Sequence, residues 1–565
     1  MRYSVLLGKI SGTEFSFEET ETAVLLSRLG FLHHTGDGAV SLLPLGTRVL
    51  RHIEEAFESE LTRRGAQKIE IPQLVRQDLL FASGRYELFD GDSLYFRNEN
   101  GEEFFQTGHY EEVVVNFLRP FAVSEKDFPI CIYFYSNKTR PVGDQNGSAL
   151  ASREYRALNI FSAHRNMVEL NNFVPMVADI FRTLLAAWGI RTIHAETELH
   201  HSCGEKALAL VADMNGKGSD LFFSCPKCGY TASRHVAKAV HPSYVGEVKN
   251  AVKVKIPHTC DTYEKLAEYF GIPDYKIIRC DLFRTENSFL MTVCRGDYEV
   301  SREKLMHQLG FSYLRPASAA EIDVFRIRGH FLSPVGRESD DRIQVIADET
   351  VVHGSDFILG LNEEDVILKN ANLGIDFDVN RVLDIAVAKE GDLCLQCGVP
   401  MTIRRESELV RLIKTGTVYS EKMGLRSLVR GKKQAICLGS YATDLLRVFY
   451  VVAEKARGSN GFRWPSGLAP FLFYLYGEGQ TLKSKEILEN LYNRYSAEIL
   501  WDDRSVGIAE KERTAQLLGI PYVIVIDDTL SERNCLAVYS RLSGKKSEYP
   551  IDFPLLEFKN RNSSF

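Results

Sequence analysis

The sequence predicts a mixed α/β (α+β) protein made of several domains. Three observations indicate this: a length of 565 residues, a long amphipathic helix followed by β-rich segments, and a continuous apolar run, YVIVIDD, near the C-terminus. At about 150 residues per domain, the length favours roughly four domains. The apolar run is typical of a parallel strand that is covered on both faces. The two ends of the chain therefore predict different kinds of sheet.

The composition is that of an ordinary globular protein. Charged residues make up 25% of the chain, hydrophobic residues 45%, and the formal net charge is −7. This balance excludes a disordered acidic tail, a collagen-like repeat and a histone-like basic coat. Any nucleic acid must be held by local basic patches, because the net charge repels it.

Cysteine content and hydropathy indicate the compartment. The 11 cysteines are too sparse for a disulfide scaffold and favour a reducing environment. No apolar run approaches the ~18 residues of a membrane span, and the first ten residues lack the apolar core of a signal peptide. We therefore expect a cytoplasmic protein that does not contact a membrane.

The N-terminal half begins with a predicted helix and continues with strands. After SLLPLG, Val49, Ile53 and Phe57 recur at helical spacing, and charged residues occupy the opposite face. The segment QKIEIPQL predicts a strand interrupted by Pro72, which cannot donate a ladder hydrogen bond. Residues 100–165 are rich in strand-forming residues, with the polar loop PVGDQNGS in between, so they predict an antiparallel pair.

Several segments, spread in one order over nearly the whole chain, carry a family pattern. They are RLGFLHHTGDGAVSLLPLGTRVLRHIEE, IEIPQLVRQDLLFASGR, HYEEVVVNFLRP, REYRALNIFSAH, RGDYEVSREKL, KTGTVYSEKMGL, WPSGLAPF and LLGIPYVIVID. Together they resemble the bacterial-type prolyl-tRNA synthetases, which are class II aminoacyl-tRNA synthetases. The resemblance implies an antiparallel-sheet catalytic domain, an inserted editing-like domain and a C-terminal α/β anticodon-binding domain.

The resemblance also implies the domain limits and the assembly. A homodimer is expected, with the helix from Val49 to Arg63 and with Pro72 at its interface. The four expected parts are the first part of the catalytic domain (1–224), the editing-like insert (225–397), the second part of the catalytic domain (398–472) and the anticodon-binding domain (473–565).

The implied reaction joins an amino-acid carboxylate to the α-phosphate of ATP, with Mg²⁺, and then transfers the amino acid to tRNA. Arginine suits this site because its fork of donors pairs bidentately with phosphate and carboxylate oxygens. By resemblance, Arg140 in NKTR holds the α-phosphate and the carboxylate, and Arg447 in YATDLLR holds the γ-phosphate. Tyr155 stands where the family has an aromatic residue that stacks on adenine.

Three positions depart from the family pattern around the nucleotide. A glutamate after the first arginine is replaced by Val142, and two glycines near the second arginine are replaced by Ala442 and Asp444. The loop PVGDQNGSALAS carries no basic residue. Glycines at such places let the backbone approach the nucleotide. An aspartate there adds bulk and like-sign charge beside phosphate.

The expected amino-acid pocket is also altered. Glu111 is the expected partner of the substrate amine or imino group, and Glu205 matches a further pocket glutamate more loosely. His109 replaces a threonine of the family, and Arg411 replaces a histidine. These changes make the pocket bulkier and more cationic, so the substrate can differ from free proline.

The insert and the last domain carry further candidates. Lys276 aligns with the lysine that the family uses to clear mischarged tRNA, whereas Ile367 stands where a histidine is expected. This leaves open a deacylase or a structural or tRNA-contacting role. In the last domain, Arg504 and Lys511 match positions that grip the anticodon stem, and basic residues there would contact phosphate.

Two CxxC pairs lie at the two edges of the insert: Cys225 with Cys228, and Cys394 with Cys397. Four thiolates are a set that zinc prefers, and the edges of an inserted domain must come close together. Free thiols without a metal and a redox-active pair are the alternatives.

The sequence supports three functions: a prolyl-tRNA ligase, a paralogue that adenylates a different acid, and a non-catalytic tRNA-binding or regulatory protein. Arg140, Arg447 and Glu111 favour the enzymes. Val142, Asp444 and the uncharged loop favour the third function.

Overall fold

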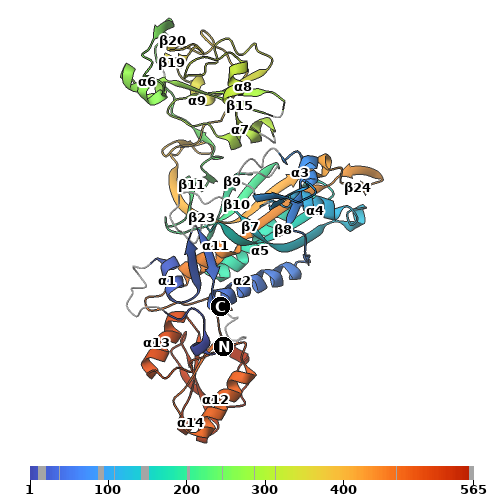
Figure 1. The fold of residues 1–565 in the computed structure, drawn as a ribbon, viewed down its shortest axis with the longest axis vertical. Helices are drawn as coiled ribbons and strands as arrows, with labels where there is room; N and C mark the ends of the chain where they lie inside the picture. Colours follow the sequence, from blue (N-terminus) through green and yellow to red (C-terminus); the bar gives the residue numbers. More distant parts are fainter. Residues whose placement is uncertain are drawn as a thin grey trace.

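The computed structural model describes residues 1–10, 21–36, 38–86, 94–106, 108–140, 152–199, 204–244, 246–285, 287–311, 314–465 and 467–558. Figure 1 shows an elongated arrangement, with the inserted domain at one end, the large sheet in the middle and the C-terminal domain at the other end. Val142 and the loop around it lie outside the described residues.

The middle of the molecule is built on a nine-stranded sheet with the order β10-β9-β12-β11-β23-β26-β8-β7-β3. Its neighbouring strands are antiparallel except for the pairs β3–β7 and β9–β12. The predicted antiparallel pair is therefore confirmed as β7 and β8. The strands are β3 (Gln67–Lys68), β7 (Ile130–Thr139), β8 (Glu154–His164), β9 (Thr192–Thr197), β10 (Lys206–Ala212), β11 (Asp220–Ser224), β12 (Thr231–Ser233), β23 (Thr402–Gly416) and β26 (Cys437–Asp444).

The apolar face of the first long helix is used inside the chain. Helix α2 (Pro44–Arg63) packs with α5 (Met167–Ala187) and α11 (Leu445–Lys455). Phe57 is buried, with its ring centroid 5.3 Å from that of Phe181. The prediction that this stripe binds a second copy is therefore wrong, because the stripe already packs against its own domain.

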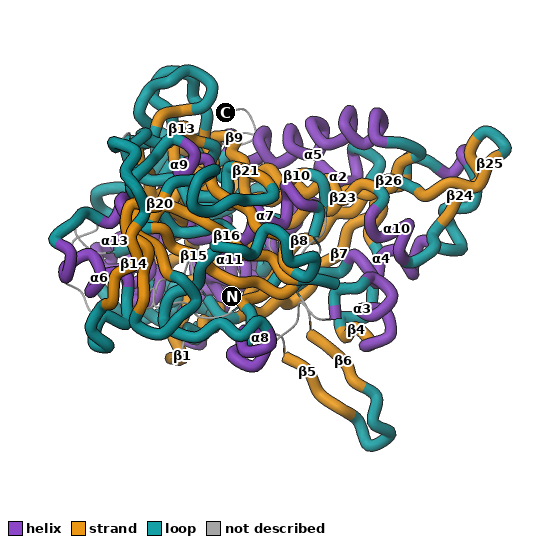
Figure 2. Tube along the Cα trace, turned by 90° about the horizontal axis from the view of Figure 1, so that it is seen from above, coloured by secondary structure: helices purple, strands orange, loops and turns teal. Residues whose placement is uncertain are grey.

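A small three-stranded sheet lies beside the large one, in the order β4-β6-β5. Figure 2 shows the hairpin of β5 and β6 projecting from the body of the molecule. The elements near this sheet are β4 (Leu74–Arg76), α3 (Gln77–Ser83), β5 (Leu94–Arg97), β6 (Glu103–Gln106), α4 (Glu111–Leu118) and α10 (Val418–Lys422), and β24 (Arg426–Val429) pairs with β25 (Lys432–Ala435) in a separate hairpin. Helix α1 (Thr22–Arg28) lies away from them, beside α11, and is followed by β1 (Leu32–Gly36) and β2 (Ala39–Leu42).

The inserted domain has two sheets of its own, β17-β15-β16-β18-β21 and β14-β20-β19. Its two connections run side by side, because β13 (Ala239–Val240) pairs with β22 (Leu393–Cys394). Strand β12 lies after the expected boundary at 225 but still pairs within the large sheet. The other elements are β14 (Val252–Lys255), α6 (Tyr263–Phe270), β15 (Ile278–Arg284), β16 (Phe289–Arg295), α7 (Arg302–Leu309), β17 (Arg315–Pro316), α8 (Ala319–Val324), β18 (Ile343–Asp348), α9 (Glu349–Val352), β19 (Phe357–Gly360), β20 (Val366–Ala371) and β21 (Arg381–Leu383).

The C-terminal domain contains a five-stranded sheet with the order β28-β27-β29-β30-β31. The run YVIVI forms β29, which is buried and parallel to β27, as predicted. Among the described helices, none is long and apolar enough to cross a membrane. The elements are β27 (Phe473–Gly477), α12 (Leu482–Arg494), β28 (Ile499–Trp501), α13 (Ile508–Leu518), β29 (Tyr522–Ile526), α14 (Asp528–Glu532), β30 (Cys535–Ser540) and β31 (Lys546–Pro550).

Candidate functional site

The structure brings the expected nucleotide-binding residues together at one end of the large sheet. Arg140 follows β7, and Asp444 ends β26. The Nη2 of Arg140 donates to Oδ2 of Asp444 at 2.9 Å, and its Nε donates to the carbonyl of Ser152 at 2.8 Å. The guanidinium carbon lies 4.4 Å from the ring centroid of Tyr155. Arg140 and Tyr155 therefore form one stacked wall of the site.

Asp444 also connects the two arginines. It is the N-cap of α11, where its Oδ1 accepts a hydrogen bond from the backbone N–H of Arg447 at 2.9 Å. The Nη1 of Arg447 donates to Oδ2 of Asp220 and to the carbonyl of Glu408, both at 2.9 Å. Burial alone would lower the pKa of Arg447, but the carboxylates of Asp220, Asp444 and Glu408 raise it overall. Both arginines are therefore held in place by carboxylates.

The middle of β23 supplies the next part of the site. The Nε of Arg411 donates to Oε1 of Glu408 at 2.7 Å, and the hydroxyl of Thr197 donates to the other oxygen at 2.9 Å. Burial raises the pKa of Glu408, while Arg411 opposes that effect. Arg411 thus lies in the site, as the resemblance implies, but its charge is shared with a glutamate on the same strand.

Lys138 is a residue of this site that the sequence analysis missed. Its side chain is only 7% exposed, and its Nζ lies 5.7 Å from the ring centroid of Tyr110. Burial lowers its pKa to about 8, while Glu111 raises it and Arg411 lowers it further. Among the described residues, its ammonium group makes no hydrogen bond or ion pair. Alternation along β7 was the available signal, since it places Lys138 two residues before Arg140 on the same face.

Glu111, the candidate partner of the substrate amine, is buried close to Arg85 and His109. It is 4% exposed, and its Oε2 lies 3.6 Å from Nη1 of Arg85 and 4.0 Å from Nδ1 of His109. The neighbouring Glu112 is fully buried and takes the closer contact with Arg85, at 2.9 Å. The structure therefore brings His109, Glu111, Lys138 and Arg411 to one region beside the arginines.

Glu205 is not brought to this site, which corrects the prediction for that residue. Its Oε1 lies beside Gly416, 3.2 Å from where a Cβ on that glycine would be. Gly416 ends β23, about 25 Å from Glu408 at roughly 3.3 Å per residue along the strand. The loose alignment in this segment explains the error.

The insert does not present its editing candidates in the expected form. The Nζ of Lys276 is 3.2 Å from Oδ2 of Asp356, and a hydrogen bond to Tyr244 is the main cause of its raised pKa. Ile367 is fully buried in an apolar cluster with Ile256. Lys276 therefore has a carboxylate partner, and the position of the missing histidine belongs to a core.

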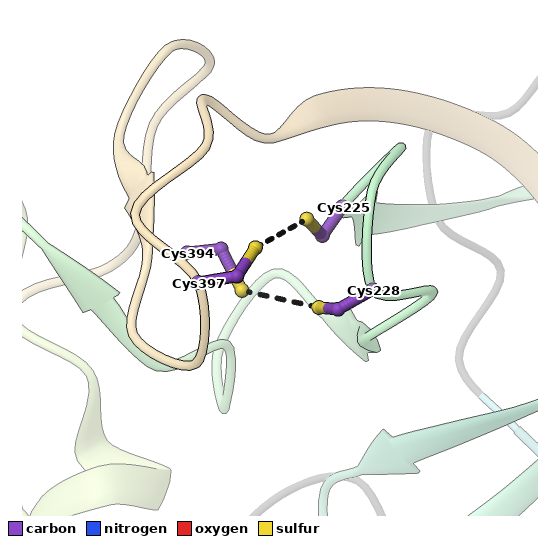
Figure 3. Close-up of side chains that lie close together, drawn as sticks. All are labelled: Cys225, Cys228, Cys394 and Cys397. Atoms are coloured by element: carbon purple, nitrogen blue, oxygen red, sulfur yellow. Dashed lines mark hydrogen bonds between the residues drawn. The ribbon is translucent and has the colours of Figure 1, made fainter.

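The four cysteines of the two CxxC pairs meet at the base of the insert (Figure 3). Sγ of Cys225 lies 3.3 Å from that of Cys397, and Sγ of Cys228 lies 3.6 Å from that of Cys394. All four sulfurs lie within 4.8 Å of one another. For a zinc–sulfur bond of about 2.3 Å, a tetrahedron places its sulfurs roughly 3.8 Å apart. The four residues present therefore fit a zinc ion.

The two candidates for tRNA binding have partners inside the chain. Arg504 donates to both carboxylate oxygens of Asp502, at 2.8 and 2.7 Å, and its guanidinium lies 4.0 Å from the ring centroid of Tyr3. Lys511 is 8% exposed, and its Nζ is 3.5 Å from the carbonyl of Asp502. Both residues therefore fasten the domain internally, and their contact with tRNA phosphates stays a prediction.

The fold and two of the domains resemble those of class II aminoacyl-tRNA synthetases. Residues 258–377 match the model of the aminoacyl-tRNA editing domain, and residues 478–560 match the model of the anticodon binding domain. A crystal structure of prolyl-tRNA synthetase from Cryptosporidium parvum, complexed with halofuginone and AMPPNP, shares the fold. Its TM-score is 0.51 at 11% identity, covering 96% of this chain and 78% of that chain.

Within this class, the chain is similar over nearly its whole length to proline--tRNA ligases. That of Thermosipho africanus is 29% identical, covering 94% of this chain and 95% of the relative. That of Kosmotoga olearia is 28% identical, covering 94% and 92%. These comparisons confirm the predicted resemblance and the fold class, and they support an aminoacyl-tRNA ligase function.

Proposed function

We propose that this chain activates proline with ATP and transfers it to tRNA. The observation that carries the proposal is the meeting of Arg140, Tyr155 and Arg447 at one end of the sheet, beside the buried Glu111. The similarity to proline--tRNA ligases supports proline as the substrate.

In this reaction a carboxylate oxygen of proline attacks the α-phosphorus of ATP, and pyrophosphate leaves. Arg140 would neutralise the charge that develops on the α-phosphate, and Arg447 would hold the far end of the triphosphate. Asp220, which pairs with Arg447, and Glu408, which pairs with Arg411, are the carboxylates that would hold Mg²⁺, whose charge would neutralise the phosphate oxygens. The prolyl group then passes to a ribose hydroxyl of tRNA, and AMP leaves.

A second candidate is a protein that binds tRNA without activating proline, or that adenylates a different acid. The observation in its favour is that Arg140 pairs with Asp444 and Arg447 with Asp220. ATP must displace or outcompete these carboxylates before the arginines can reach its phosphates.

Pyrophosphate exchange with each of the twenty amino acids tests the proposal. We expect exchange with proline, and a loss of about 10²–10³ in rate in Arg140→Ala, because one donor to the transition state is removed. Arg156→Ala is the matched control, since Arg156 lies on β8 but pairs with Glu54, outside the site. Exchange with another acid alone would support the paralogue, and no exchange with any amino acid would end the catalytic proposal.

We also propose that Cys225, Cys228, Cys394 and Cys397 bind one Zn²⁺ ion that joins the two connections of the insert. The sulfur spacing supports this, because it suits four thiolates around a single ion and is too long for disulfides. Purified protein should contain about one zinc per chain, and Cys228→Ser should lose it. Cys535→Ser, outside the cluster, is the control. Wild-type protein with less than about 0.1 zinc per chain would contradict the proposal.

We further propose a cytoplasmic homodimer whose interface includes the small sheet and α3. Large apolar side chains are exposed there, including Tyr95 at 63% and Phe81 at 55%. Contiguous exposed apolar surface often marks a protein–protein interface. Light scattering should give twice the chain mass for wild type and the chain mass for Tyr95→Glu. A wild-type chain of about 64 kDa at micromolar concentration would contradict the dimer.

A further inference from the structure

Two histidines and an aspartate from three separate loops of the insert form a cluster that the proposed function does not use. His258 follows β14, His330 lies in the loop after α8, and Asp365 directly precedes β20. Nδ1 of His258 is 3.2 Å from Oδ1 of Asp365, and the two imidazole centroids are 5.4 Å apart. One ligand atom from each residue lies within 4.8 Å of the others.

The backbone ties the first and third of these loops together. The N–H of Ile256, two residues before His258, donates to the carbonyl of Asp365 at 2.9 Å. Strands β14 and β20 continue this backbone pairing, with Val254 opposite Ile367. The spacing of His258 and Asp365 is therefore set by the backbone pairing of the sheet and not by their side chains alone.

The loop that carries His330 is held against the segment that leads into β20. The N–H of Ser333 donates to the side-chain oxygen of Asn362 at 2.9 Å, and the Asn362 amide donates back to the Ser333 carbonyl at 3.1 Å. Gly329, directly before His330, has φ +101, and a Cβ there would lie 2.5 Å from the carbonyl of Glu363. Only glycine permits this close approach of the two loops.

The charges around the cluster favour a cation. In the described part of the chain, Asp365 makes no ion pair with a lysine or arginine, and its side-chain partner is His258. A second carboxylate, Asp261, lies close enough to His330 to interact with it electrostatically, although Lys265 pairs with it at 2.6 Å. The cluster thus offers two imidazoles and one carboxylate that, among the described residues, pairs with no lysine or arginine.

We propose that His258, His330 and Asp365 bind a divalent metal ion of the borderline class, such as Zn²⁺, Co²⁺ or Ni²⁺. Imidazole and carboxylate together suit these ions. At metal–ligand distances of about 2.1 Å, neighbouring ligand atoms lie roughly 3.0–3.4 Å apart. The pair of His258 and Asp365 already has this spacing, and rotation of the exposed His330 ring closes the remaining gap. Water fills the other positions.

The test is nickel binding by the full-length chain, prepared without a histidine tag and with the cysteine cluster left in its purified state. Isothermal titration should show one Ni²⁺ bound per chain. His258→Ala and His330→Ala should each weaken binding by about tenfold or more. His353→Ala, an exposed histidine of the same domain outside the cluster, should bind as wild type does.

Cobalt spectroscopy separates this site from the cysteines. Co²⁺ bound at the histidine cluster should give weak visible bands without the intense sulfur-to-cobalt charge transfer of a thiolate site. The side chains of His258 and His330 are exposed, so both variants should melt at the wild-type temperature. The proposal is overturned if wild type binds no Ni²⁺ up to about 100 μM. It is also overturned if a variant that carries both His258→Ala and His330→Ala binds Ni²⁺ as well as wild type does. The outcome does not depend on ligase activity.

Discussion

Replacing Asp444 is expected to change folding stability and ATP binding in opposite directions. Its Oδ1 caps α11 at 2.9 Å from the N–H of Arg447, and its Oδ2 pairs with Arg140 at 2.9 Å. Loss of an N-cap costs about 1 kcal/mol. Loss of a partly screened ion pair adds up to about 1 kcal/mol. Asp444→Ala should therefore lower the free energy of unfolding by about 1–2 kcal/mol.

The same substitution should improve ATP binding. It removes a negative charge from beside the phosphates and releases Arg140 from its carboxylate partner. If removing the ion pair and the repulsion makes the free energy of ATP binding more favourable by about 1–2 kcal/mol, the KM for ATP falls roughly 5–30-fold. Pyrophosphate exchange over a range of ATP concentrations measures this change, and thermal melting measures stability.

Asp444→Asn is the matched control, because asparagine is also a good N-cap but carries no charge. It should lower the KM for ATP as Asp444→Ala does, while its melting temperature stays close to that of wild type. An unchanged or higher KM in both variants would show that Arg140 does not have to leave Asp444 for ATP to bind. That result would refute the reasoning from this ion pair.

Two further predictions concern the buried Lys138 and the partly buried Arg504. The folded-state pKa of Lys138, about 8, lies below its ordinary value of 10.5. Below pH 8 the buried charge therefore lowers the free energy of unfolding by up to about 3 kcal/mol, and this effect disappears as the pH rises to 10.5. Lys138→Met should accordingly be more stable than wild type at pH 7, but not at pH 10.5, in urea unfolding; a pH-independent difference would contradict this. Arg504→Ala leaves the buried Asp502 without its bidentate partner and should cost about 3–5 kcal/mol, seen as a lower melting temperature. The exposed Lys485→Ala should melt as wild type does, and an unchanged Arg504→Ala would return that arginine to the tRNA-contact hypothesis.

Local patterns were sufficient to predict those elements whose partners are near in sequence. The helical spacing of Val49, Ile53 and Phe57 gave α2, and two strands around one polar loop gave the pair β7 and β8. The same patterns could not reveal what α2 packs against. Its apolar face meets α11, which follows the whole insert in the chain, so the stripe was assigned to a second copy instead of to the core.

In the site, too, residues with a local sequence signal could be predicted, whereas contacts between distant segments could not. Arg140 and Arg447 could be found because each lies in a recognisable segment, and the CxxC pairs because their spacing is local. Their partners could not, because the contacts of Asp444 with Arg140 and of Asp220 with Arg447 depend on strand register across the sheet. The partners of Arg504 were not predictable for the same reason: nothing around it in sequence indicates that Tyr3 lies on its guanidinium.

Lys138 is the residue for which the contrast between sequence pattern and packing matters most for function. Alternation could place it beside Arg140, but lysines are rarely buried, and only the packing of α4 over β7 makes it 7% exposed. A buried ammonium without an ion pair lowers stability, so its position is best explained by what it binds. It lies where Glu111 and Arg411 both influence its charge. The cationic character that His109 and Arg411 suggested from the sequence is therefore increased by a third group. If the chain activates an amino acid, we therefore expect this pocket to bind the carboxylate of the substrate more strongly than its imino group.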